Sequence, residues 1–255
     1  MSRIIARIVL AGMILWAGSA AAADGRGTVR LGYIFLDEEG NESVNYRTFN
    51  TYDGFLYSVE DLVYNLDNGI RIRADFKNIT LDNRKIDFRL DRPRRYGLQF
   101  HHSDYRRVYS ADGADNTRRK TVSGNAWVDP FSFLRVYGGL GNVNREGTAR
   151  ELFEIEGNNA GDQILLPHDY DLMSYHAGLR LHRHASMLQA EYRGQQFTDD
   201  LDSSRDQKRS RLRVNAALSH PSYNWILIYG GMQSYATEYE EAERELTSNS
   251  GWGGV

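Results

Sequence analysis

Apolar and polar residues alternate strictly after the tripeptide Asp67-Asn68-Gly69. Every second residue is apolar and the residues between are charged: Ile70, Ile72, Ala74 and Phe76 on one side, and Arg71, Arg73, Asp75 and Lys77 on the other. Successive side chains of a β-strand point to opposite faces, so this segment predicts a strand with one apolar and one charged face. The tripeptide can adopt the positive φ angles of a tight turn. Residues 62–77 therefore predict a β-hairpin.

The same alternation recurs along most of the chain. It predicts strands within residues 28–36, 62–66, 70–77, 85–91, 96–101, 122–128, 134–140, 172–180, 188–193, 211–218 and 224–235. Residues 44–57 are ambiguous, because they fit either one long strand or a strand with a loop. The count is therefore about eleven strands, or twelve if this segment holds an extra one. After the N-terminal segment, no stretch shows the 3.6-residue period of an amphipathic helix over a useful length.

The predicted connections alternate between short and long. Tight turns fall near residues 68, 93, 130, 183 and 220, and most of the longer segments, such as 105–120, 144–167 and 198–208, lie between them. Pro93, Pro130 and Pro221 sit in the short turns, where no backbone donor is needed for strand pairing. Up-and-down barrels of the bacterial outer membrane have this asymmetry, with short periplasmic turns and long outer loops.

The first residues predict export. Arg3 and Arg7 precede an apolar run at 8–18, and Ala21-Ala22-Ala23 provides small residues for cleavage before Asp24. This is the organisation of a signal peptide, so we assign residues 1–23 to it and 24–255 to the mature chain. No apolar stretch of about 18 residues follows, and a helical membrane span is not predicted.

The predicted strands are compatible with two folds, a soluble β-sandwich and a transmembrane barrel. A soluble barrel of a dozen strands would enclose a centre too wide for side chains to fill, and alanine and glycine interrupt the apolar faces. A barrel in a bilayer instead turns the apolar face to lipid and the charged face to a wet interior. We therefore predict an all-β fold, an up-and-down antiparallel transmembrane β-barrel surrounded by outer-membrane lipid.

Two sets of side chains follow from this orientation. The predicted lumen-lining cations are Arg71, Arg73, Lys77, Arg89, Arg135, Arg180, Arg193, Arg211 and Arg213. They fit either a ladder of cross-strand ion pairs or a positive interior that favours anionic solutes or an acidic partner. Aromatic residues beside the short turns predict an interfacial girdle: Tyr96, Trp127, Phe131, Tyr223 and Trp225.

The number of predicted strands is a test of whether the chain forms a complete barrel. Eleven strands would leave the last one at the long-loop end, whereas complete single-chain bacterial barrels have an even number. Residues 248–255 fit the opening of a further strand. We therefore hypothesise that 24–255 is the N-terminal part of a longer barrel. An extra strand within 44–57 is the alternative.

Residues 27–54 contain a glycine- and aromatic-rich pattern that ends in Asp-Gly. The positions that carry it are Gly27, Val29, Leu31, Gly32, Tyr33, Asp37, Gly40, Asn41, Asp53 and Gly54. The segment resembles the start of the MtrB/PioB-type outer-membrane proteins. This resemblance implies a large barrel that forms a sheath around a periplasmic multihaem c-type cytochrome, which carries electrons across the outer membrane. The chain lacks the paired cysteines found near the start of some members.

Other chemistry is sparse. The chain has no cysteine, which excludes disulfides, thiolate metal sites, a catalytic cysteine and covalent c-type haem attachment. His101 and Ser103 share one strand face, but no acidic third member is evident for a hydrolase triad. We predict no enzymatic role, no cofactor, no metal site and no nucleic-acid partner. The predicted function is the cytochrome sheath, with a general diffusion porin of mainly basic lumen as the alternative.

Overall fold

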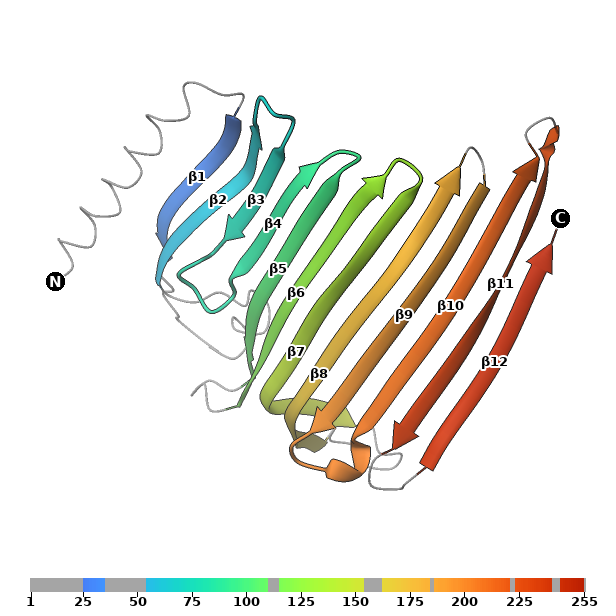
Figure 1. The fold of residues 1–255 in the computed structure, drawn as a ribbon. Coiled ribbons are helices and arrows are strands. Elements are labelled where there is room, and N and C mark those ends of the chain that lie inside the picture. Colours follow the sequence, from blue (N-terminus) through green and yellow to red (C-terminus); the bar gives the residue numbers. More distant parts are fainter. Residues whose placement is uncertain are drawn as a thin grey trace.

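The computed structural model describes residues 25–34, 54–109, 115–153, 162–183, 186–220, 223–239 and 244–254. Twelve strands within these ranges form one antiparallel sheet, and each strand pairs with its neighbours in sequence (Figure 1). They are β1 (Gly25–Ile34), β2 (Gly54–Asn65), β3 (Arg71–Lys77), β4 (Lys85–Arg92), β5 (Tyr96–Val108), β6 (Asn116–Phe131), β7 (Leu134–Phe153), β8 (Asp162–Arg183), β9 (Ser186–Asp199), β10 (Gln207–His220), β11 (Tyr223–Tyr239) and β12 (Arg244–Gly254). The prediction of an all-β, up-and-down antiparallel fold is confirmed.

The turn that begins the alternation forms as predicted. Gly69 has a φ of 80°, and its N–H donates to the carbonyl of Leu66 at 2.9 Å. The side-chain oxygen of Asn68 accepts from the N–H of Ile70 at 3.1 Å. The short turns lie at one end of the sheet and the longer connections at the other, which is the predicted asymmetry (Figure 1).

The predicted count of eleven or twelve strands agrees with the twelve that the structure describes, and the twelfth includes most of residues 248–255, where a further strand was expected to open. β12 pairs with β11 from Tyr239↔Arg244 to Tyr229↔Gly254. It ends at the short-turn end of the sheet, where β1 begins (Figure 1). That residues 24–255 are the N-terminal part of a longer barrel stays a hypothesis. Of residues 44–57, which we considered for an extra strand, 54–57 belong to β2 and 44–53 lie outside the described ranges.

Two predicted loops are largely strand. β7 and β8 stay in register from Leu134↔Leu181 to Phe153↔Asp162, through most of the predicted loop at 144–167. β5 and β6 likewise pair as far as Val108↔Asn116. These extensions lack the strict alternation of apolar and polar residues from which the strands were predicted. Backbone pairing does not require an apolar face.

An apolar belt covers one face of the sheet. The side chains of directly paired residues point to the same face of the sheet, and so does every second side chain along one strand. The belt therefore comprises every second residue of each strand and the residues paired with them. On β8 it comprises Met173, Tyr175, Ala177, Leu179 and Leu181, which span about 26 Å at about 3.3 Å per residue. Its members are exposed: Leu140 is 62% exposed, Leu218 57% and Met232 60%. Buried hydrophobic residues in the described ranges are few (Val59, Ala74, Leu81, Val108, Tyr109 and Ala149), so the sheet has no dry core of its own there.

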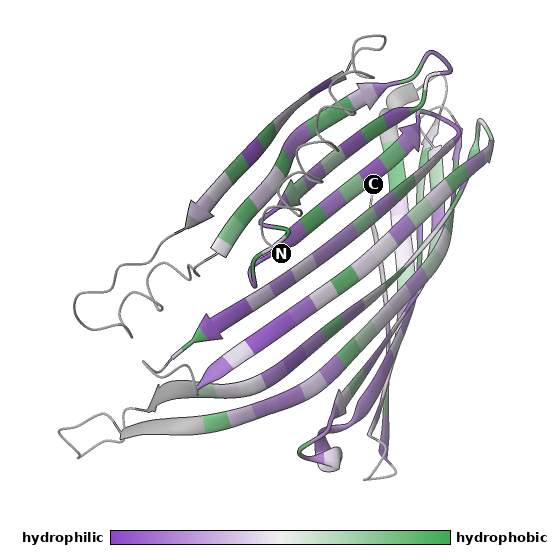
Figure 2. Ribbon diagram, turned by 90° about the vertical axis from the view of Figure 1, so that its left-hand side faces the viewer, coloured by the Kyte–Doolittle hydropathy of each residue, from purple (hydrophilic) through white to green (hydrophobic). Residues whose placement is uncertain are grey.

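The sheet is strongly curved, as the side view in Figure 2 shows. In the part of the chain that is described, β1 and β12 each have one hydrogen-bonded neighbour and are not paired with each other. The helices of this part include none that is long and apolar enough to cross a membrane.

Candidate functional site: the charged face

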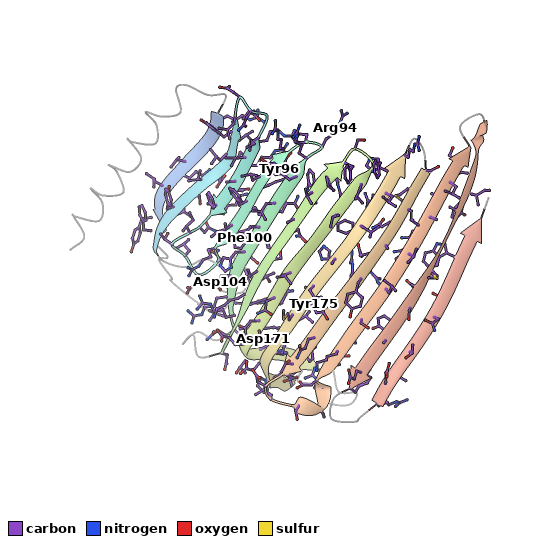
Figure 3. The ribbon with its side chains drawn as sticks, viewed as in Figure 1. Arg94, Tyr96, Phe100, Asp104, Asp171 and Tyr175 are labelled. Carbon is purple, nitrogen blue, oxygen red and sulfur yellow. The ribbon has the colours of Figure 1, made fainter. Side chains whose placement is uncertain are left out.

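The cations predicted to line the lumen all share one face of the sheet, opposite the apolar belt. We call this the charged face. Its central row, read through the strand pairings, runs Arg73, Arg89, Gln99, Asn125, Gly139, His176, Arg193, Arg211 and Tyr235. Figure 3 draws the side chains on both faces of the sheet, and its labels Tyr96, Phe100 and Asp104 follow β5 from the short-turn end toward the long-loop end.

Like charges oppose each other on the charged face. Arg73 lies opposite Arg89, Asp75 opposite Asp87, and Lys77 opposite Lys85, because the charge order of β3 is mirrored in β4. Two further pairs repeat the pattern, namely Arg135 with Arg180 and Arg193 with Arg211. Directly opposed like charges are destabilising. A ladder of directly opposed ion pairs is therefore not what the described residues form.

Neutralisation on this face occurs both along single strands and across neighbouring strands. Lys77 pairs with Asp75 at 3.3 Å, Arg89 with Asp91 at 3.3 Å, and Arg193 with Glu191 at 2.5 Å, each two residues apart. The pair Arg71–Asp91, at 2.5 Å, does join directly opposed residues. Asp91 therefore serves two cations, Arg71 and Arg89.

Arg135 has the most elaborate surroundings. Its guanidinium donates two hydrogen bonds to Asp129, at 2.7 and 2.8 Å, and lies 4.2 Å from the centre of the Trp127 ring. Trp127 in turn lies across Gly97, where a Cβ would meet the indole at 2.5 Å. Trp127 is thus on the charged face, which differs from the predicted interfacial girdle.

Other girdle residues lie on the apolar side. Tyr96 opposes Val128 there, and Phe131 is 58% exposed and stacks on Phe133 at 5.5 Å. A register shift between Val128 and Phe131 keeps both on the apolar face, whereas Trp127, one residue earlier, points to the other. The side chains of Tyr223 and Trp225 lie outside the described residues, so their place in a girdle stays a prediction.

Tyr137 links three strands of the charged face. It lies across Gly178 of β8 and reaches β9, where its hydroxyl donates to Glu191 at 3.0 Å and accepts from the Gln189 amide at 2.7 Å. Gly178 makes this reach possible because a Cβ there would come within 2.6 Å of the Tyr137 ring.

Four of the cations predicted to line the lumen have no carboxylate partner among the described residues, namely Arg73, Arg180, Arg211 and Arg213. Arg180 contacts Gln189 at 3.4 Å, and Arg213 contacts Asn215 at 3.2 Å and lies 5.2 Å from the Trp252 ring centre. Amides and rings do not cancel their charge.

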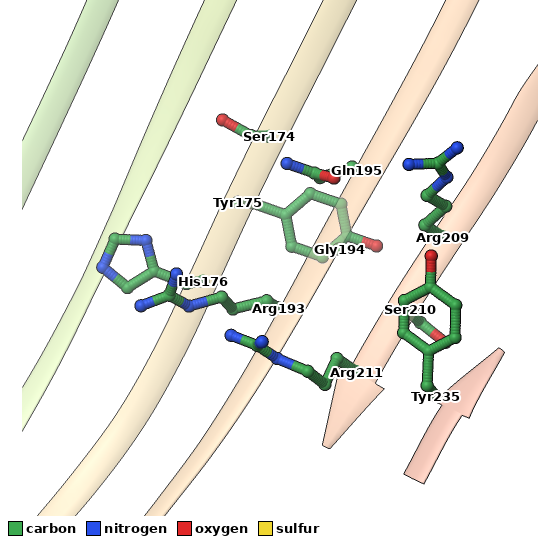
Figure 4. A pocket seen from close by; sticks show the side chains of 10 residues that line it. All are labelled: Ser174, Tyr175, His176, Arg193, Gly194, Gln195, Arg209, Ser210, Arg211 and Tyr235. Atoms are coloured by element: carbon green, nitrogen blue, oxygen red, sulfur yellow. The ribbon is translucent and has the colours of Figure 1, made fainter. Parts of the chain in front are cut away.

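A cavity of about 310 Å³ opens on the charged face over β8–β11 (Figure 4). We call it the arginine pocket, and its side chains come from alternate positions on that face: Ser174, His176, Arg193, Gln195, Arg209, Arg211 and Tyr235. Between these positions, Tyr175, Gly194 and Ser210 complete the lining. Figure 4 shows the guanidinium groups of Arg193 and Arg211 extending toward His176.

A second cavity, of about 370 Å³, lies over β3–β6, and we call it the mixed-charge pocket. Its charged-face lining contains acids as well as bases: Arg73, Asp75, Asp87, Arg89, Gln99, His101 and Asn125. Both pockets lie along the central row. Asn125 and His176 approach each other between them, because Gly139 leaves the space that both side chains use.

The acidic partner of His101, which the sequence did not reveal, is Asp87. Its Oδ1 lies 2.6 Å from the Nδ1 of His101, and Lys85 contacts the same carboxylate at 2.9 Å. The two residues are directly opposed on β4 and β5, so counting back from the short turn at 93–95 would have found the pair. Within the described strands no hydrogen bond joins the His101 ring to Ser103, and a nucleophile for hydrolysis is not assembled there.

Metal ligands do not gather in the described ranges, where no group of three or more His, Asp or Glu residues forms a metal-binding cluster. The acidic run after β9 is engaged in local structure. Asp199 pairs with Arg205 at 2.8 Å. The side chain of Asp202 accepts a hydrogen bond from the N–H of Ser204 and caps the start of a short 3₁₀ turn, η2 (Ser203–Arg205).

An ionic cluster lies beyond the apolar belt at the long-loop end. Asp104 opposes Lys120, two residues past the last belt position on β6, and accepts two hydrogen bonds from Arg118 at 2.8 and 2.6 Å. Burial raises the pKa of the Asp104 carboxyl, but the hydrogen bonds and charge of Arg118, with the charges of Arg84 and Lys120, outweigh this and hold the pKa below its ordinary value. The same pairing raises the pKa of Arg118.

These features define an antiparallel sheet with an exposed apolar belt on one face and charged side chains on the other. No family model matches the chain, and no curated protein matches it. Among solved structures, the chain is similar to an anion-selective porin from Comamonas acidovorans, with 11% identity and a TM-score of 0.43. The match covers 78% of this chain and 56% of the porin chain.

Proposed function

We propose that the chain forms a β-barrel of the bacterial outer membrane that lets anionic solutes diffuse through a positively charged interior. The observation that supports this most is the set of arginines without carboxylate partners, Arg73, Arg180, Arg211 and Arg213, on the face opposite the exposed apolar belt. A ring of uncompensated positive charge favours anions over cations in a pore.

The energetics of a bilayer support this orientation. An arginine on the lipid face near the bilayer centre costs about 2–4 kcal/mol, so a sheet with this many arginines on one face inserts with that face inward. The belt residues gain from lipid contact. The free edges of β1 and β12 need partners in hydrocarbon, since unpaired backbone groups are costly there, and closure of the barrel supplies them.

Planar-bilayer recordings test the proposal. Under a salt gradient, the purified protein should give a reversal potential that indicates anion preference, and the triple change Arg73→Gln, Arg180→Gln and Arg213→Gln should reduce it. Arg94→Gln, in the exposed turn between β4 and β5, removes a charge away from the face and should leave the preference unchanged. Cation preference of the unaltered protein would contradict the proposal.

The second candidate is the sheath for a multihaem c-type cytochrome, which rests on the resemblance of residues 27–54. Its described positions fit a barrel strand: Val29, Leu31 and Tyr33 alternate along β1 and are 50%, 47% and 55% exposed. Asp37, Gly40, Asn41 and Asp53 lie outside the described residues. Co-purification of a haem protein in fixed ratio would favour the sheath, whereas conductance by the isolated chain favours the porin.

Export belongs to the same proposal, with residues 1–23 as the signal peptide and the outer membrane as destination. N-terminal sequencing of the protein recovered from outer membranes should begin at Asp24. Recovery from the periplasm without detergent would contradict both candidate functions.

A further inference from the structure

We infer that the arginine pocket is a binding subsite for oxyanions, the carboxylate or phosphate groups of small organic solutes, inside the proposed channel. This inference rests on the proposed function and adds a specific binding site within the channel. General positive charge attracts any anion, whereas a subsite holds one chemical group.

The charge of the pocket is the first support. Arg193 is neutralised by Glu191 at 2.5 Å. Arg209 is held by the neutral amide of Gln207, at 3.1 and 2.8 Å, and Arg211 has no hydrogen-bond or ion-pair partner among the described residues. The pocket therefore contains two guanidinium charges that no described carboxylate offsets.

The placement of these charges is the second support. Arg211 is directly opposite Arg193, so their Cβ atoms are about 4.5–5.5 Å apart, and Arg209 follows on the same face two residues away. Such a group of like charges repels itself. An anion between the guanidinium groups would relieve the repulsion, and planar guanidinium forks match carboxylate and phosphate oxygens in bidentate hydrogen bonds.

The volume of the pocket and its neutral hydrogen-bonding groups restrict which anions can bind. A cavity of about 310 Å³ is at the lower end of the range for small-molecule sites, so it admits a small organic anion as well as an inorganic one. Ser174, Gln195 and Tyr235 place hydroxyl and amide groups around the arginines. These groups can bind the remaining oxygens of a hydroxylated or multiply charged solute.

The mixed-charge pocket provides an internal contrast. It also contains two opposed arginines, Arg73 and Arg89, but Asp75 and Asp87 line it as well. Those carboxylates repel an oxyanion, so the anion subsite belongs to β8–β11.

Block of the chloride current tests the subsite with two probes, inorganic phosphate and succinate. We expect at least one of them to reduce the current through the full chain at concentrations where nitrate does not. Arg211→Gln should raise the blocking concentration about 10- to 100-fold, the effect of one lost charge-assisted hydrogen-bond partner. Arg211→Lys keeps the charge without the fork and should fall between. Arg209→Gln provides a second variant if Arg211→Gln does not fold.

Arg180→Gln is the matched control, because it removes the same charge from the same face outside the pocket. It should lower anion preference and leave block by the probe unchanged. Equal loss of block in Arg180→Gln and Arg211→Gln would overturn the subsite, as would an anion-selective channel that neither probe blocks. Both results leave the proposed function standing. A cation-selective channel would instead overturn the proposed function itself.

Discussion

Arg71 and Asp91 face each other across β3 and β4, with Nη2 and Oδ2 2.5 Å apart, and the Asp91 side chain is 2% exposed. The same carboxylate also pairs with Arg89 at 3.3 Å. One buried acid thus holds two arginines that would otherwise repel each other. It is the clearest point at which charge on this face is compensated.

Asp91→Asn should therefore destabilise the protein and make it more anion-selective. Loss of the charge-assisted hydrogen bonds between this buried acid and two partly exposed arginines costs about 1.5–3 kcal/mol. The urea midpoint in detergent micelles measures the first effect and the reversal potential the second. Asp67→Asn, in the exposed turn, is the control and should change neither; unchanged stability of Asp91→Asn would argue against this view of the pair.

Leu179→Arg tests which face meets lipid. Leu179 is 41% exposed and lies near the centre of the belt on β8. An arginine there should cost about 2–4 kcal/mol in a bilayer and lower the yield of folded protein. Leu201→Arg, 55% exposed but beyond the belt, should be tolerated. Folding yield into lipid vesicles, read from the heat-modifiable band on SDS gels, would be equal for both only if the belt did not face lipid.

Gly178→Ala tests the Tyr137 network. The new Cβ would lie 2.6 Å from the Tyr137 ring, so the ring must leave Gln189 and Glu191, at an expected cost of about 1–3 kcal/mol. Gly124→Ala is matched, since its Cβ would meet nothing closer than 3.9 Å. Urea midpoints compare the two. A similar midpoint for both variants would show that Tyr137 can be displaced without loss.

Asp104 gives the long-loop end a defined response to acid. Its folded pKa lies below the ordinary value of 3.8, so its contribution to stability is present above about pH 4 and is lost as pH falls through the lower folded pKa. Asp104→Asn should reduce stability at pH 7 and flatten this acid-dependent part. Melting curves at pH 7 and pH 3 measure the difference. Asp200→Asn, which changes an exposed acid in the connection between β9 and β10, should retain the wild-type dependence.

Alternation predicted the parts of the fold that a membrane constrains. The charged face, from Arg71 to Arg213, follows from side-chain parity alone. The same signal disappears in the ends of β7 and β8 that meet the long connection and in the glycine- and serine-rich β12, although the backbones pair there. Trp127 was assigned to the girdle because it lies beside a short turn, whereas the alternation from Val122 to Val128 places it on the charged face.

The arginine pocket needed information that one sequence does not contain. The opposition of Arg193 and Arg211 depends on the register between β9 and β10, which a long connection joins, so no turn geometry fixes it. The Asp87–His101 pair was within reach, because the β4–β5 turn is short and sets the register. The pairing of residues on two strands can therefore be predicted where a short turn joins the strands. It cannot be predicted where a long connection joins them.

The order of the strands has one more consequence. Each strand pairs with its neighbours in sequence alone, so a break in the chain at η2 would interrupt only the β9–β10 seam. Everything on either side of that seam is built from local hairpins, which form quickly because little chain must be closed to make them. A piece with β1–β9 and a piece with β10–β12, produced separately, should therefore recombine side by side.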